Sequence, residues 1–244
     1  MTERSDLWRV VRRLVPEKVR RTVQSRLRRW PPMRWGGLRR LTPVSRVFGF
    51  DRGMPIDRFF IDEFLDEHRE RIQGSVLEIA DGTYTRRFGR DVVRSDVLYP
   101  VPGNSAATVV GDLATGAGVP MDSYDCIILT QTLQFIYDFT GAVKTCHDAL
   151  RSRGTLLATI SGTSQISRYD MDRWGEYWRF TDLAARKVFC GVFGDNNVEV
   201  STYGNVLACV AFLHGLSVGE LRRSELLYRD PDYQLIIAVC ARKS

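Results

Sequence analysis

The chain is poor in the residue types that build metal sites and disulfide scaffolds. Its 244 residues include three histidines far apart in sequence, His68, His147 and His214, and five cysteines, none of them in a CxxC pair. A structural zinc site needs four clustered ligands of these types, and a disulfide scaffold is typical of short secreted chains with paired cysteines. We therefore expect reduced, buried cysteines and no metal.

Long apolar runs are also missing. No stretch reaches the roughly 20 apolar residues of a membrane-spanning helix, and the first residues lack the apolar core of a secretory signal. Apolar residues make up 44% of the chain and charged residues 26%, which is typical of a soluble folded protein. We expect a cytoplasmic protein with one large domain, or one domain with an appendage.

Positive charge is concentrated at one end of the chain. Residues 1–50 hold 14 basic and 3 acidic side chains, whereas the other 194 residues hold 21 basic and 26 acidic ones. Leu7, Val10, Val11 and Leu14 recur at helical spacing among arginines, and a second stripe follows over 19–30. We therefore predict a basic, amphipathic, helical N-terminal arm over residues 1–54.

Three roles are open for this arm. Its apolar stripe could pack on the main domain or on a partner, either another protein or a second copy in a homodimer. A stripe of tryptophan and leucine among arginines is also typical of peripheral contact with an anionic membrane surface. Nucleic acid is the least favoured partner, because no nucleic-acid motif accompanies the charge.

From residue 55 onward, short apolar runs alternate with helical patterns. Such an alternation predicts an α/β domain, in which helices cover both faces of a mostly parallel sheet. Ligands of these sheets bind beyond the carboxyl ends of the strands. Predicted strands cover 76–79, 92–96, 108–110, 126–129, 155–160, 198–200 and 235–241, and predicted helices cover 57–73, 139–150, 182–192 and 218–227.

Several segments together resemble the motifs of a known family. They are 76–82 (Val-Leu-Glu-Ile-Ala-Asp-Gly), Asp96, 111–113, 119–125 and 150–156. In this order and at these spacings they resemble class I S-adenosylmethionine-dependent methyltransferases. The resemblance implies a Rossmann-like, seven-stranded, mostly parallel sheet over residues 55–244, with S-adenosylmethionine as cofactor.

Three further segments point to one group within this family. Segments 48–58, 84–89 and 174–181 resemble methyltransferases found beside, or fused to, bacterial glycosyltransferases. This implies O-methylation of a small-molecule acceptor that contains a sugar or belongs to secondary metabolism, as in antibiotic biosynthesis.

The resemblance also implies which residues bind the cofactor. Asp96 would accept hydrogen bonds from the ribose hydroxyls, Asp112 and Leu113 would contact the adenine, and the methionine part would lie against Asp81 and Gly82. The complete implied set is Glu78, Ala80, Asp81, Gly82, Asp96, Asp112, Leu113, Thr130 and Gln131. A structural alternative stays open, because an aspartate at a strand end can cap the following turn or helix and Glu78 could merely hold the loop.

The first motif departs from the family pattern E-x-G-x-G-x-G. Its three glycine positions hold Ala80, Gly82 and Tyr84. Glycine lets the backbone approach a ligand closely, and a tyrosine could cover part of the cofactor site. Two alternative hypotheses therefore stay open: an enzyme of this fold that cyclises or eliminates without S-adenosylmethionine, and a subunit or scaffold that does not methylate.

Residues 161–181 follow the fifth predicted strand, and we expect them to form a lid on the acceptor side. Asp170 and Glu176 are the candidate general bases for deprotonating an acceptor hydroxyl. Aromatic rings interleaved with charged groups suit a sugar ring, which makes the substrate candidates Tyr169, Trp174, Tyr177, Trp178 and Arg179. Alternatively the lid only packs its rings on the core. Residues 204–230 are predicted to be a helical insertion that roofs the site or contacts a second copy.

Overall fold

The computed structural model describes residues 36–244. The chain divides into two units, residues 1–41 and residues 42–244. Of the first unit, the described part contains one short 3-10 helix, Gly36–Leu38. Most of the predicted arm lies outside the described residues, so its helices, its partners and its membrane contact stay predictions. Residues 42–54, which the sequence analysis assigned to the arm, belong to the second unit.

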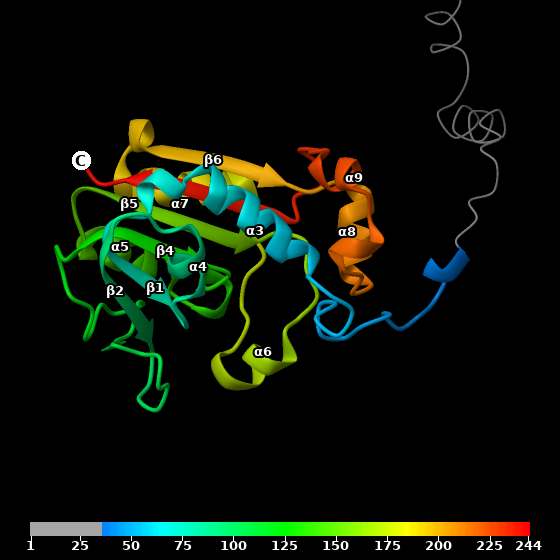
Figure 1. Cartoon of the computed structure of the whole chain (residues 1–244), viewed down its shortest axis with the longest axis horizontal. Helices are drawn as coiled ribbons and strands as arrows, with labels where there is room; N and C mark the ends of the chain where they lie inside the picture. Colours follow the sequence, from blue (N-terminus) through cyan, green and yellow to red (C-terminus); the bar gives the residue numbers. More distant parts are fainter. Residues whose placement is uncertain (1–35) are drawn as a thin grey trace, which may run out of the picture. The chain divides into compact units, whose positions relative to one another are not determined.

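A seven-stranded sheet forms the centre of the second unit (Figure 1). The strand order is β3-β2-β1-β4-β5-β7-β6, and β7 runs antiparallel to both of its neighbours while the other pairs are parallel. This confirms the predicted fold class, a Rossmann-like, mostly parallel sheet with helices. The strands are β1 (Gly74–Ile79), β2 (Val92–Tyr99), β3 (Val109–Val110), β4 (Tyr124–Thr130), β5 (Leu150–Ser161), β6 (Val198–Tyr203) and β7 (Ile236–Arg242).

The central strands are continuous apolar runs because helices cover the sheet on both faces. Successive side chains of β4 alternate between the two layers: Ile127 packs in one core cluster and Ile128 in the other, and neither is exposed. Helices α5 (Phe139–Ala149) and α7 (Asp182–Phe193) complete the first cluster. The second contains α3 (Ile56–Glu67), α4 (Thr83–Phe88) and α8 (Val206–Leu213).

The structure corrects the extent of two strands. Strand β2 does not end at Asp96, because its pairing with β1 continues through Leu98, which lies opposite Ile79, and the strand ends at Tyr99. Strand β5 begins at Leu150 rather than at Thr155, since Leu150 already pairs with Tyr124 of β4. Both errors arise because polar residues interrupt the apolar pattern inside a strand that backbone pairing continues.

Two segments are additional to the alternation of strands and helices that builds the sheet. The predicted lid contains α6 (Arg168–Trp174). The hydroxyl of Ser167 caps this helix by accepting a hydrogen bond from the backbone amide of Asp170. In Figure 1, α6 is set off from the sheet on a loop that leaves β5. The insertion before β7 contains α8, a 3-10 turn at Val218–Glu220 and α9 (Arg223–Leu227), so the helix predicted over 218–227 is broken. Within the described residues, no helix has both the length and the apolar character that crossing a membrane requires.

Candidate functional site

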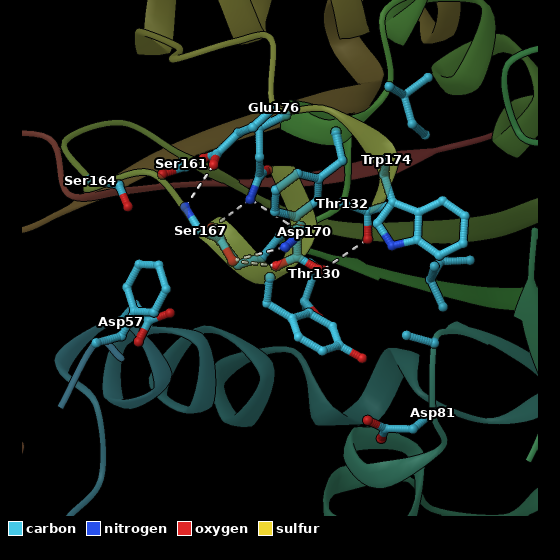
Figure 2. A pocket seen from close by; sticks show the side chains of 18 of the residues that line it. Asp57, Asp81, Thr130, Thr132, Ser161, Ser164, Ser167, Asp170, Trp174 and Glu176 are labelled. Atoms are coloured by element: carbon cyan, nitrogen blue, oxygen red, sulfur yellow. Dashed lines mark hydrogen bonds between the residues drawn. The ribbon is translucent and has the colours of Figure 1, made fainter. Parts of the chain in front are cut away.

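A cavity of about 770 Å³ lies at the carboxyl ends of β1 and β4, between the loop after β1, helix α3 and the lid. Its size falls in the range of small-molecule and cofactor sites. Figure 2 shows Asp57 and Asp81 on one wall and Ser167, Asp170 and Trp174 on the opposite one. The topology therefore places the cavity where ligands of open α/β sheets bind.

Most of the candidate residues line this cavity. On the sheet side they are Glu78, Ala80, Asp81, Asp112, Leu113, Thr130 and Gln131, and on the lid side they are Tyr169, Asp170, Trp174, Glu176 and Tyr177. The lining does not include Gly82, Asp96, Trp178 or Arg179.

Asp96 lies in the middle of β2, opposite Leu77, and not at the end of the strand. Its carboxylate accepts hydrogen bonds from the hydroxyls of Thr108 (2.9 Å) and Tyr124 (3.2 Å) and forms an ion pair with Arg94. Asp96 therefore does not line the cavity, and its carboxylate is engaged by neighbouring side chains instead. Burial, together with the charge of Asp96, raises the pKa of Tyr124 to about 12, so the phenol stays a donor to this carboxylate.

Tyr99 and Pro100 line the cavity at the end of β2 in place of Asp96. Tyr99 packs edge-on against Trp174 of the lid, with ring centroids 5.9 Å apart. A phenol can both donate and accept a hydrogen bond. Tyr99 is therefore the polar side chain that β2 offers to a ligand here.

Trp178 and Arg179 serve the lid instead of facing the cavity. The Trp178 indole nitrogen donates to the carbonyl oxygens of Ile136 and Tyr137, at 3.2 Å each. Arg179 donates to the carbonyl oxygen of Gln165 (2.8 Å) and forms an ion pair with Glu176 (2.5 Å). These two substrate candidates therefore fit the structural alternative, in which the lid packs its own side chains.

Glu176 is also bound within the lid. Its side chain is 4% exposed, Oε1 contacts Arg179, and Oε2 accepts a 2.8 Å hydrogen bond from the amide of Ser167. The carboxylate of Asp170 has fewer partners, since one of its oxygens accepts a 2.6 Å hydrogen bond from the Ser167 hydroxyl. Of the two candidate bases, Asp170 has the fewer contacts within the lid.

Glu78 holds the loop after β1. Its buried carboxylate accepts hydrogen bonds from the amides of Tyr84 (2.9 Å) and Thr85 (2.7 Å) and from the Thr85 hydroxyl (2.7 Å). Burial raises the pKa of this carboxyl, and the three hydrogen bonds oppose the shift. Glu78 thereby fixes the start of α4 and the shape of the cavity wall.

Ala80 and Tyr84, which stand at two of the motif's glycine positions, both line the cavity. Ala80 has φ +74°, a left-handed conformation that glycine adopts freely and alanine adopts at a cost of about 1–2 kcal/mol. Its amide donates to Leu98 and its carbonyl oxygen accepts from Asn104, both at 3.0 Å. The Tyr84 ring stacks on Phe88, and its hydroxyl accepts a 3.1 Å hydrogen bond from Arg58 of α3.

Asp112 is exposed at the cavity edge, where its carboxylate also caps its own turn. It accepts hydrogen bonds from the Ala114 amide (2.8 Å) and the Thr115 hydroxyl (2.9 Å). Each carboxylate oxygen has two lone pairs, so capping leaves capacity for a ligand. Leu113 beside it is 4% exposed and lines the same wall.

Sequence reasoning missed two buried polar groups of the lining. Asp57 in the first turn of α3 is 8% exposed, and Gln134 is 4% exposed; Asp57 Oδ1 and Gln134 Oε1 lack hydrogen-bond partners. The signal for Asp57 was its spacing, since it lies three and four residues before Phe60 and Ile61 on the apolar face of the helix. A carboxylate at such a position is buried unless the helix turns it away.

Similarity to known proteins is confined to the fold. The chain matches no family model and no curated protein. It resembles the crystal structure of a SAM dependent methyltransferase from Archaeoglobus fulgidus, at 11% identity over 76% of this chain and 94% of that chain, with a TM-score of 0.49. It is also similar to the N-methyltransferase NodS from Bradyrhizobium japonicum WM9 in complex with S-adenosyl-L-homocysteine, at 13% identity over 82% of this chain and 93% of that chain, with a TM-score of 0.49. A third similar structure is the [4+2]-cyclase SpnF, at 15% identity over 75% of this chain and 80% of that chain, with a TM-score of 0.48. At these identities the likeness assigns no activity to this chain.

Proposed function

We propose that the chain is an S-adenosylmethionine-dependent methyltransferase that methylates a hydroxyl of a sugar-containing or secondary-metabolite small molecule. One observation supports this most directly. The loop at 80–81, the pair Asp112 and Leu113, and the pair Thr130 and Gln131, to which the family motifs assign the cofactor, all open onto one cavity.

The residues present fit S-adenosylmethionine with one departure. Ala80 keeps the left-handed backbone that the first glycine of the motif provides, and the Tyr84 ring is held against Phe88 and Arg58. The departure is at the end of β2, where Tyr99 replaces the carboxylate expected for the ribose. We assign the ribose to Tyr99, the adenine to Asp112 and Leu113, and the methionine part to the loop at 80–81.

The bound cofactor would supply an electrophilic methyl group on a positively charged sulfur. The protein's task is then to align an acceptor oxygen with that methyl group and to exclude water, since alignment contributes much of the rate of such displacements. Trp174, Tyr177 and Tyr169 give the acceptor side flat apolar faces, and Ser161, Ser164 and Ser167 give it hydroxyls. Asp170 is our candidate to receive the acceptor's proton, and Glu176 positions the lid.

A titration with S-adenosylhomocysteine tests the proposal. We expect the wild-type protein to bind it, and Asp112→Ala to weaken binding about tenfold, because a hydrogen bond to a charged group is lost. Asp138→Ala is the matched control: Asp138 caps α5 through the amide of Gly141 but does not line the cavity. A folded wild-type protein that does not bind would contradict the proposal.

The alternative is a reaction in the same cavity without S-adenosylmethionine, namely a cyclisation or elimination. One observation favours it: β2 ends at Tyr99, followed by Pro100, where the family motif expects a carboxylate. The titration separates the two functions, because the alternative needs no affinity for S-adenosylhomocysteine.

A further inference from the structure

Asp57 has a buried oxygen without a hydrogen-bond partner. It lies in the first turn of α3, its residue is 8% exposed, and it lines the cavity wall opposite the lid (Figure 2). Among the described residues, Asp57 Oδ1 is the buried carboxylate oxygen that has no hydrogen-bond partner. Leaving such a group unsatisfied is costly, and none of the described residues supplies a donor to it.

The neighbouring guanidinium does not satisfy this oxygen. Arg58 Nε lies 3.8 Å from Oδ2, the other oxygen of Asp57, which is beyond hydrogen-bond distance. Arg58 instead donates to the Tyr84 hydroxyl at 3.1 Å. Oδ1 of Asp57 is therefore the oxygen without a hydrogen-bond partner, while Oδ2 is in a long ion pair with Arg58.

The cavity lining as a whole carries more negative than positive groups, although Arg58 lies beside Asp57. Six carboxylates line the cavity against three guanidinium groups, those of Arg46, Arg58 and Arg168. The rings of Phe48 and Phe212, with centroids 5.8 Å apart, line the same cavity and make part of its wall apolar. Charge–charge attraction is stronger where water is excluded.

We propose that the acceptor carries a protonated amine, which Asp57 binds, in addition to the hydroxyl that is methylated. The substrate class is a polar ring with an ammonium group, such as an amino sugar. The ammonium has no free electron pair and is not the methylated atom, so it serves as the handle that orients the ring. This inference rests on the proposed function, since it names the acceptor of that same site.

The test compares D-glucosamine with D-glucose, which differ in one amine. Both are titrated into the wild-type protein, Asp57→Asn and Asp172→Asn at neutral pH, with and without saturating S-adenosylhomocysteine. Asp172 is an exposed residue of α6 outside the cavity lining, so its variant changes the same charge without touching the site. A thermal melt of each variant establishes that it is folded.

We expect the wild-type protein and Asp172→Asn to bind glucosamine at least about tenfold more tightly than glucose, the factor that one charged hydrogen bond supplies. Asp57→Asn should bind the two sugars alike. The proposal is overturned if the wild-type protein shows no preference, if it binds neither sugar, or if folded Asp57→Asn keeps the preference.

The two proposals fail separately in this experiment. Absence of S-adenosylhomocysteine binding would end the methyltransferase proposal, while a preference for glucosamine that depends on Asp57 would still stand without the cofactor. Conversely, tight S-adenosylhomocysteine binding with no preference between the sugars would leave the methyltransferase proposal standing and refute the proposal that the acceptor carries an amine.

Discussion

Glu176 and Arg179 form an ion pair inside the lid, with Oε1 and Nη2 2.5 Å apart, and the other oxygen of Glu176 accepts a 2.8 Å hydrogen bond from the amide of Ser167. One carboxylate thus joins the residue before α6 to the segment after it. From these contacts we expect Glu176 to position the lid, and its assignment as a base stays a prediction.

Glu176→Ala should therefore loosen the lid and lower stability. Removing a carboxylate that is 4% exposed leaves Arg179 and the Ser167 amide without their partner, at a cost of about 2 kcal/mol. Urea unfolding measures the loss, and hydrogen exchange should show faster exchange over 161–181. Glu176→Gln keeps an acceptor for the amide and should lose less; equal exchange in all three proteins would refute this role.

Ala80→Gly should raise stability, because the left-handed φ of +74° costs alanine about 1–2 kcal/mol in the folded state. Part of this gain is offset because glycine gives the unfolded chain more conformational freedom. We expect a net gain of up to about 1 kcal/mol in the free energy of unfolding. Ala106→Gly is the control, since Ala106 is exposed and lacks positive φ, and it should lose stability. Two equal losses would mean that Ala80 is not strained.

The sheet could be predicted from the sequence because its signal is local. Apolar runs such as 126–129 alternate with helical patterns, and a fully covered strand must be apolar on both faces. The failures occurred where a strand continues through polar residues. Asp96 ends the apolar pattern of β2, but its backbone pairs opposite Leu77 and its side chain finds Thr108 and Tyr124, contacts that spacing alone does not reveal.

The candidate site was predictable only as a location. The motifs placed most cofactor candidates around one cavity because parallel strands bring their carboxyl ends to one edge. They did not show which carboxylates the fold already uses. Glu78 and Glu176 are occupied by backbone amides, whereas Asp57, from a helix before the first strand, has the unpartnered oxygen.

Asp96→Asn should change stability and leave the cavity alone. The variant weakens the contacts with Thr108, Tyr124 and Arg94, so we expect a loss of about 1–2 kcal/mol in the free energy of unfolding. Its affinity for S-adenosylhomocysteine should stay within about twofold of the wild-type value, a smaller change than the loss of one hydrogen bond to the ligand would cause. A drop of tenfold or more in calorimetry would show that Asp96 reaches the ligand after all.

The same cluster predicts an alkaline dependence of stability. Burial and Asp96 raise the pKa of Tyr124 from 10.0 to about 12 in the folded protein. The protonated phenol therefore contributes stability that is complete below pH 10 and is lost as the pH rises toward 12. Denaturant unfolding at a series of pH values should show a steeper alkaline decline for the wild-type protein than for Tyr124→Phe. Parallel curves would contradict it.

Asp57→Asn should stabilise the protein at neutral pH when no ligand is bound. Burial raises the pKa of Asp57 in the folded state, so folding is favoured below the pKa of the unfolded carboxyl and this contribution is lost as the pH rises through the folded pKa. The asparagine has no such charge to bury. The difference in unfolding free energy between Asp57→Asn and the wild-type protein should thus grow in favour of the variant from acid to neutral pH. If the difference were flat, or favoured the wild-type protein at neutral pH, the Asp57 carboxylate would have a partner within the fold, and the reason to assign it a ligand would disappear.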